Sequence, residues 1–262
     1  EHAILGWFNP NEPYSDPKAA EWARRAYLGM LQRIDKYLGE LMNSLGPNDV
    51  LIVLGDHGQW EIRAFVRVNV ALRKAGLLVV DSAGKVDFEK SVAYYDGGYV
   101  YINPKYKSDP ALYAQVVNKV VDVLLSLRDP RTGENPIAMV LARRFGPRGP
   151  LSSIYGDERS AVYLDGPASY RAGDVVLAVK PGYCAYDRTA TGEDVFVIPS
   201  RFETVGCHDD LGSFMELRAA FGVYGGNAVK IRKMADVQIM MPQVGSTAAA
   251  LLGVTLKNAT FP

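Results

Sequence analysis

The stretch Val50-Leu51-Ile52-Val53-Leu54-Gly55-Asp56-His57-Gly58 decides the fold of this chain. Five β-prone apolar residues in a row are typical of a strand that is covered on both faces in a parallel sheet. A long amphipathic helix is predicted before it, starting at Ser15-Asp16-Pro17 and stopped by Gly46-Pro47-Asn48-Asp49. The order of helix, short loop and buried strand predicts an α/β protein, with helices flanking a parallel-rich sheet.

The middle of the chain predicts a small α+β subdomain inserted into the main sheet. Residues 98–103 alternate like a strand, residues 110–127 repeat like a helix, and residues 136–141 and 161–164 are strand-like. A helix is also predicted over residues 64–74. The main layer resumes with a strand at 174–179, and a last helix starts at Pro242. We therefore expect an α/β core over residues 1–90, the subdomain over 91–170 and the rest of the core over 171–262.

Composition excludes several classes of partner. The chain has 262 residues, and its 29 Lys plus Arg balance its 29 Asp plus Glu, so the formal net charge is zero. This balance argues against a protein-wide attraction to nucleic acid or acidic lipid, and no apolar run approaches the roughly 18 residues of a membrane span. Two cysteines, Cys184 and Cys207, favour reduced thiols. We expect a cytoplasmic protein with neither nucleic acid nor membrane as a partner.

The chain has only three histidines, His2, His57 and His208. Asp56 and His57 supply one oxygen and one nitrogen from a turn after a strand, a mixture that Zn²⁺, Mn²⁺ and Fe accept. His208 lies in a similar loop, before Asp209-Asp210. Taken singly, each motif leaves an alternative open: His57 could cap a turn, His208 could lie on a surface loop, and His2 is uninformative.

The ordered set of motifs resembles the C-terminal part of the alkaline phosphatase superfamily, in its type I phosphodiesterase/nucleotide pyrophosphatase branch. The resemblance spans nearly the whole chain. The matching stretches are residues 1–7, 27–39, 50–58, 68–78, 98–103, 129–134, 206–208, 215–225 and 249–254.

This resemblance implies an alkaline-phosphatase-like fold with two divalent metal ions, Zn²⁺ in the first place and Mn²⁺ or Mg²⁺ as alternatives. Asp56 and His57 would bind one ion, and His208 and His2 would bind the other. Asp209 departs from the family, which often has glycine after the loop histidine.

The resemblance also implies that the Ser/Thr nucleophile lies upstream of residue 1. We therefore expect a portion of a metal-dependent hydrolase of small, nucleotide-like phosphate esters, inactive alone and with homo-oligomerisation left open. Two alternatives remain. One is a phosphosugar mutase or phosphonate hydrolase of the same superfamily, and the other is a non-catalytic binding module that retains relic metal ligands.

Overall fold

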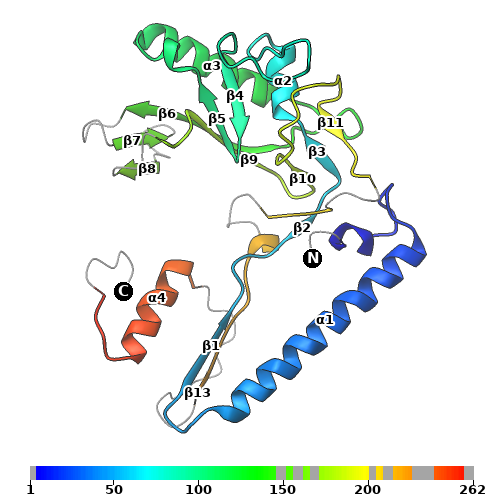
Figure 1. The fold of residues 1–262 in the computed structure, drawn as a ribbon, viewed down its shortest axis with the longest axis vertical. Helices are drawn as coiled ribbons and strands as arrows, with labels where there is room; N and C mark the ends of the chain where they lie inside the picture. Colours follow the sequence, from blue (N-terminus) through cyan, green and yellow to red (C-terminus); the bar gives the residue numbers. More distant parts are fainter. Residues whose placement is uncertain are drawn as a thin grey trace. The chain divides into compact units, whose positions relative to one another are not determined.

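The computed structural model describes residues 4–145, 152–155, 162–165, 171–200, 205–208, 215–225 and 239–256. The chain divides into two compact units. The first contains Glu1–Glu40 and Val53–Phe221, and the second contains Leu41–Ile52 and Gly222–Pro262. Figure 1 follows the elements along the chain, from blue at the N-terminus to red at the C-terminus. The boundaries expected at residues 90 and 170 stay predictions.

Helix α1 (Pro17–Ser44) begins and ends where the sequence predicts. Asp16 caps it, because its Oδ1 accepts a hydrogen bond from the Ala19 amide at 2.8 Å. Only the first turns are buried, at Ala19, Ala20 and Ala23. An amphipathic helix is expected to bury its apolar face, but beyond the first turns that face is exposed: Leu31 and Ile34 are 41% and 46% exposed. The apolar stripe is present, but its middle lies open to solvent.

The largest sheet has six strands in the order β4-β5-β9-β6-β7-β8, and every neighbouring pair in it is antiparallel. The glycine turn Gly97-Gly98, with φ of 57° and 85°, joins β4 to β5, because a tight hairpin needs positive φ at both central residues. The strands are β4 (Ala93–Asp96), β5 (Tyr99–Ile102), β6 (Ile137–Phe145), β7 (Ser152–Tyr155), β8 (Val162–Asp165) and β9 (Val175–Val179).

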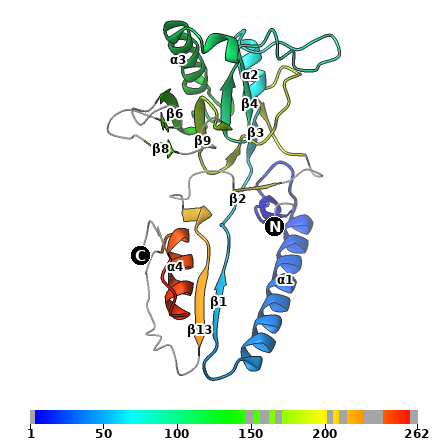
Figure 2. The ribbon, with the colours of Figure 1, turned by 60° about the vertical axis from the view of Figure 1, so that its left-hand side comes forward.

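Two helices lie beside this sheet (Figure 1, Figure 2). Helix α3 (Pro110–Ser126) packs on β6 and β9, and α2 (Val68–Lys74) packs on α3 and β4. The apolar core between these helices and the sheet contains four fully buried side chains, Val100, Val120, Leu124 and Val175. The prediction of a helix over residues 64–74 is wrong in its first part, because a strand, β3 (Ala64–Val66), precedes α2.

Two small sheets complete the first unit. One has the order β10-β3-β11, with β10 (Tyr183–Cys184) parallel to β3 and β11 (Phe196–Val197) antiparallel to it. The other pairs β2 (Trp60–Glu61) with β12 (Gly206–Cys207) in antiparallel fashion. The chain is thus α/β, as predicted, but the parallel-rich sheet is not seen. Among the strand pairs of defined direction in the described residues, only β10–β3 is parallel.

The remaining elements are short or lie near the C-terminus. Strand β1 (Val50–Leu54) pairs with β13 (Phe221–Gly225), and α4 (Met241–Leu251) ends before Gly253, whose φ is +68°. Single 3-10 turns occur at η1 (Leu5–Phe8), η2 (Pro104–Tyr106) and η4 (Met215–Leu217). None of the helices in the described ranges combines the length and the apolar character that crossing a membrane requires.

Candidate functional site

The turn after β1 carries Asp56 and His57, and glycines on either side fasten it to the chain segment around η4. The Gly55 amide donates to the carbonyl of Ala220, and the Gly58 amide donates to that of Leu217, both at 2.9 Å. A Cβ at Gly58 would lie only 2.0 Å from the Glu216 carbonyl oxygen. Position 58 therefore needs glycine, because the facing backbone leaves no room for a side chain.

Asp56 and His57 are oriented by hydrogen bonds within this turn. Asp56 Oδ1 accepts from the His57 amide at 3.0 Å, and Asp56 Oδ2 lies 3.3 Å from His57 Nε2. His57 Nδ1 is 2.9 Å from the carbonyl oxygen of Gly58. Since a carbonyl only accepts, Nδ1 carries the proton and the lone pair of a neutral ring is on Nε2. The imidazole thus presents its basic nitrogen beside a carboxylate oxygen.

The pairing of β2 with β12 brings His208 to the same place. Its register joins Glu61 to Gly206 and Trp60 to Cys207, and His208 follows directly. The rings of His57 and His208 stack with centroids 3.7 Å apart and an angle of 10° between planes. Face-to-face contact of this kind suits uncharged imidazoles, the form that binds metal ions. Two histidines far apart in sequence are therefore adjacent in the fold.

The donor atoms of Asp56 and His57 fit two positions on one divalent ion. Zn²⁺ binds histidine nitrogen and carboxylate oxygen at about 2.0–2.2 Å, so two ligands at a tetrahedral angle lie roughly 3.3–3.6 Å apart. The observed separation of Nε2 and Oδ2 is 3.3 Å. Within the described ranges, however, no group of three or more His, Cys, Asp and Glu side chains is assembled for a metal. A complete site therefore needs further ligands.

Two residues expected near this site lie outside the described residues. These are His2, the expected fourth ligand, and Asp209, the departure from the family pattern. The structure places His57 against His208 and Asp56 against His57, and the roles of all three as metal ligands stay a prediction.

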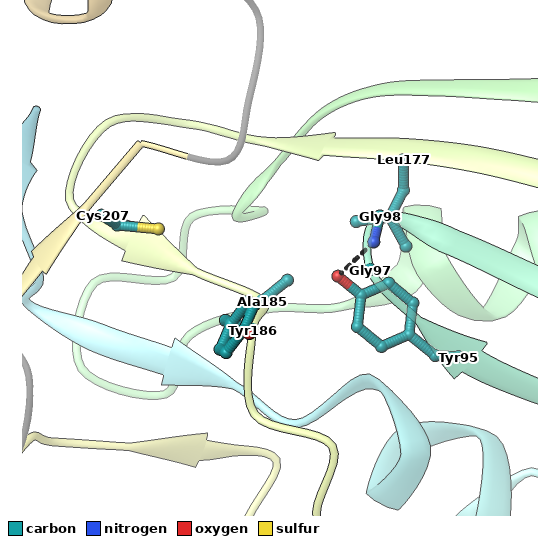
Figure 3. Close-up of a pocket in the computed structure, with 7 residues that line it drawn as sticks. All are labelled: Tyr95, Gly97, Gly98, Leu177, Ala185, Tyr186 and Cys207. Atoms are coloured by element: carbon teal, nitrogen blue, oxygen red, sulfur yellow. Dashed lines mark hydrogen bonds between the residues drawn. The ribbon is translucent and has the colours of Figure 1, made fainter. Parts of the chain in front are cut away.

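A cavity of about 100 Å³ borders the other face of β12 (Figure 3). Cys207 contributes to its wall together with Leu177, Ala185, Tyr186 and the β4–β5 hairpin, where the Gly98 amide donates to Tyr95 Oη at 3.1 Å. Small-molecule sites typically measure about 300–1,000 Å³. The cavity is therefore too small for a nucleotide-sized substrate.

The buried carboxylate of Asp129 is connected to β2 through Tyr183. Asp129 is fully buried and accepts hydrogen bonds from Arg131 Nη2 at 2.7 Å and from Tyr183 Oη at 3.1 Å. The hydrogen bond from the Arg131 guanidinium lowers the pKa of Asp129. Trp60 Nε1 donates to the carbonyl of Tyr183 at 2.9 Å, which ties the strand to this ion pair. In the sequence, Asp129 opens the family-matching stretch 129–134, and its local pattern, Asp129-Pro130-Arg131, predicts a turn but no ion pair.

Comparison with protein families matches residues 5–210 to the family described as type I phosphodiesterase / nucleotide pyrophosphatase. The match confirms the resemblance to the alkaline phosphatase superfamily that the sequence motifs indicate. The chain belongs to the type I phosphodiesterase/nucleotide pyrophosphatase family. This family comprises phosphoester hydrolases that generally depend on divalent metal ions. Neither the curated proteins nor the solved structures gave a match.

Proposed function

We propose that this chain contributes half of the metal site of a divalent-metal-dependent phosphodiesterase or nucleotide pyrophosphatase. The observation that carries the proposal is the contact between His57 and His208, with Asp56 beside them, in a chain of this family. Their substrate would be a small, nucleotide-like phosphate ester. A phosphosugar or a phosphonate remains the alternative within the superfamily, and no described contact favours it.

In this proposal Asp56 and His57 hold one ion, while His208 and His2 hold a second. Zn²⁺ is the first candidate, since histidine nitrogen and carboxylate oxygen together suit it. Bound divalent ions would neutralise charge on the phosphoryl oxygens and lower the pKa of a hydroxyl nucleophile. The chain's own contribution is orientation: the Gly58 carbonyl fixes the His57 tautomer, and the β2–β12 pairing holds His208 against it.

We further propose that additional polypeptide supplies the Ser/Thr nucleophile and the missing ligands. The exposed stripe on α1 supports this idea, because Leu28, Leu31 and Ile34 are each at least 41% exposed on one long helix. Exposed apolar side chains grouped on one helix face suit a covering segment, and we propose that the additional polypeptide supplies it. The chain alone should then turn over no substrate.

The direct test is calorimetric titration of the metal-free protein with Zn²⁺ or Mn²⁺. We expect two ions per chain in the wild type, one of which is lost in His57→Ala and the other in His208→Ala. Asp122→Ala, at an exposed position of α3, is the control and should bind like the wild type. An absence of stoichiometric metal in the wild type would instead favour a non-catalytic binding module that retains relic ligands.

Hydrolysis of bis(4-nitrophenyl) phosphate with added Zn²⁺ or Mn²⁺ tests the need for additional polypeptide. The chain alone should give no turnover above the metal-only blank. Clear turnover that disappears in His208→Ala would contradict the proposed absence of the nucleophile, while supporting the metal site itself.

A further inference from the structure

The β2–β12 register points to one more polar side chain next to His208. The register of β2 and β12 joins Trp60 to Cys207, so the next position sets Gln59 opposite His208. Cross-strand neighbours in an antiparallel pair carry their side chains on the same face, with Cβ atoms about 4.5–5.5 Å apart. Gln59 is therefore the expected cross-strand neighbour of His208, whose ring stacks on that of His57.

The carboxamide of Gln59 is buried and unpaired. Neither its Oε1 nor its Nε2 has a hydrogen-bond partner among the described residues, although both atoms are shielded from solvent. A glutamine amide offers two donor hydrogens and an accepting oxygen, and burying these without partners destabilises the folded state. An apolar side chain would fill the same space without that cost. An unpartnered buried amide next to candidate site residues needs an explanation, and a ligand that completes its hydrogen bonds would supply one.

We propose that Gln59 binds a phosphoryl oxygen of the substrate through its Nε2–H group. The inference rests on the proposed function and extends it to a residue outside the metal-ligand motifs. An amide donor suits this task, because it hydrogen-bonds an anionic oxygen without adding a positive charge that would compete with the metal ions. Asp56 cannot serve this purpose, since an ionised carboxylate only accepts hydrogen bonds.

The test combines thermal unfolding with two separate titrations, one with Mn²⁺ alone and one with inorganic phosphate in the presence of Mn²⁺. Gln59→Met keeps the length of the side chain and removes the amide. It should raise the Tm by roughly 2–4 °C, since the unpaired polar group disappears. It should leave Mn²⁺ affinity unchanged and weaken phosphate binding roughly 10- to 150-fold, the worth of a hydrogen bond to a charged group. Gln115→Met, at an exposed position of α3, is the matched control and should change none of the three.

Gln59→Glu provides a second variant of the same size. Its carboxylate should weaken phosphate binding more than methionine does, through repulsion, without weakening Mn²⁺ binding.

A fall in Tm for Gln59→Met would overturn the inference, because it would mean that the amide is bonded within the protein. Retained Mn²⁺ binding with unchanged phosphate affinity would also overturn it, while leaving the proposed function intact. Failure of the wild type to bind Mn²⁺ would overturn the proposed function, and this inference with it.

Discussion

The glycine at position 58 gives the most direct test of how the site is built. Alanine there would place a Cβ 2.0 Å from the Glu216 carbonyl oxygen, 2.9 Å from the carbon of that carbonyl and 3.0 Å from the Arg218 carbonyl oxygen. All three atoms belong to backbone, so no side chain can rotate away. The turn around η4 must move, and the 2.9 Å hydrogen bond from the Gly58 amide to Leu217 is then strained or lost.

The size of the effect follows from three contributions. Overpacking costs typically about 1–3 kcal/mol, and loss of one hydrogen bond adds about 0.5–1.5 kcal/mol. Replacing glycine also restricts the unfolded chain, which offsets the loss by about 0.4–1 kcal/mol. We expect Gly58→Ala to lower the free energy of unfolding by about 1–4 kcal/mol, measured by urea denaturation followed through tryptophan fluorescence.

Gly39→Ala is the matched control, because a Cβ at that position of α1 meets nothing within 4 Å. It should raise the free energy of unfolding by up to about 1 kcal/mol, since alanine is the better helix former. If Gly58→Ala shifts the urea midpoint upward as Gly39→Ala does, the packing of η4 on this turn is refuted. A second readout is metal affinity, which should fall in Gly58→Ala alone because His57 moves with its neighbour.

Three further predictions concern buried polar groups. Asp129→Asn should cost about 1–3 kcal/mol of unfolding free energy at pH 7, because the Arg131 hydrogen bond weakens. The pKa of Asp129 is lowered in the folded state, so the difference from wild type should shrink as pH falls through that pKa, measured by urea denaturation at several pH values. Burial raises the pKa of Glu12 above its ordinary value of 4.5, and the neighbouring carboxylate of Glu61 raises it further. Ionisation of Glu12 therefore lowers the free energy of unfolding as pH rises above 4.5, and Glu12→Gln should abolish this loss in the same urea series. Asn69→Ala should cost about 2–4 kcal/mol in urea, because the Asn69 amide exchanges hydrogen bonds of 3.0 and 2.8 Å with the Tyr95 backbone.

The sequence predicts best the elements whose signals are local. Asp16 marks the start of α1, the apolar repeat over residues 110–127 gives α3, and the alternation around Tyr99 gives β5. Each of these depends on chemistry within one turn or one strand. The end of α4 follows equally from Gly253, which adopts the positive φ that glycine favours.

The errors come from contacts between distant segments. Residues 64–66 are a strand because they pair with β10 and β11, and nothing within the segment itself specifies those partners. The parallel-rich sheet was inferred from a helix followed by an apolar strand, a pattern that fixes neither strand order nor direction. Asn69 belongs to the family-matching stretch 68–78, but the sequence does not predict its structural role. Its amide completes the hydrogen bonds of an edge strand, and that role depends on where Tyr95 lies in the fold.

The candidate site depends both on local sequence motifs and on contacts between distant segments. Sequence motifs pointed to Asp56, His57 and His208 separately, but their proximity depends on one two-residue pairing, β2 with β12. The described residues between those strands form the six-stranded sheet with its helices and the small sheet around β3. The β2 end of that segment is tied to Tyr183 by the Trp60 hydrogen bond, and the Tyr183 hydroxyl in turn donates to Asp129. A lesion at Asp129, remote from the histidines in sequence, should therefore loosen the contact between them. If these histidines bind metal ions, the order of the site depends on the packing of the residues between the two loops.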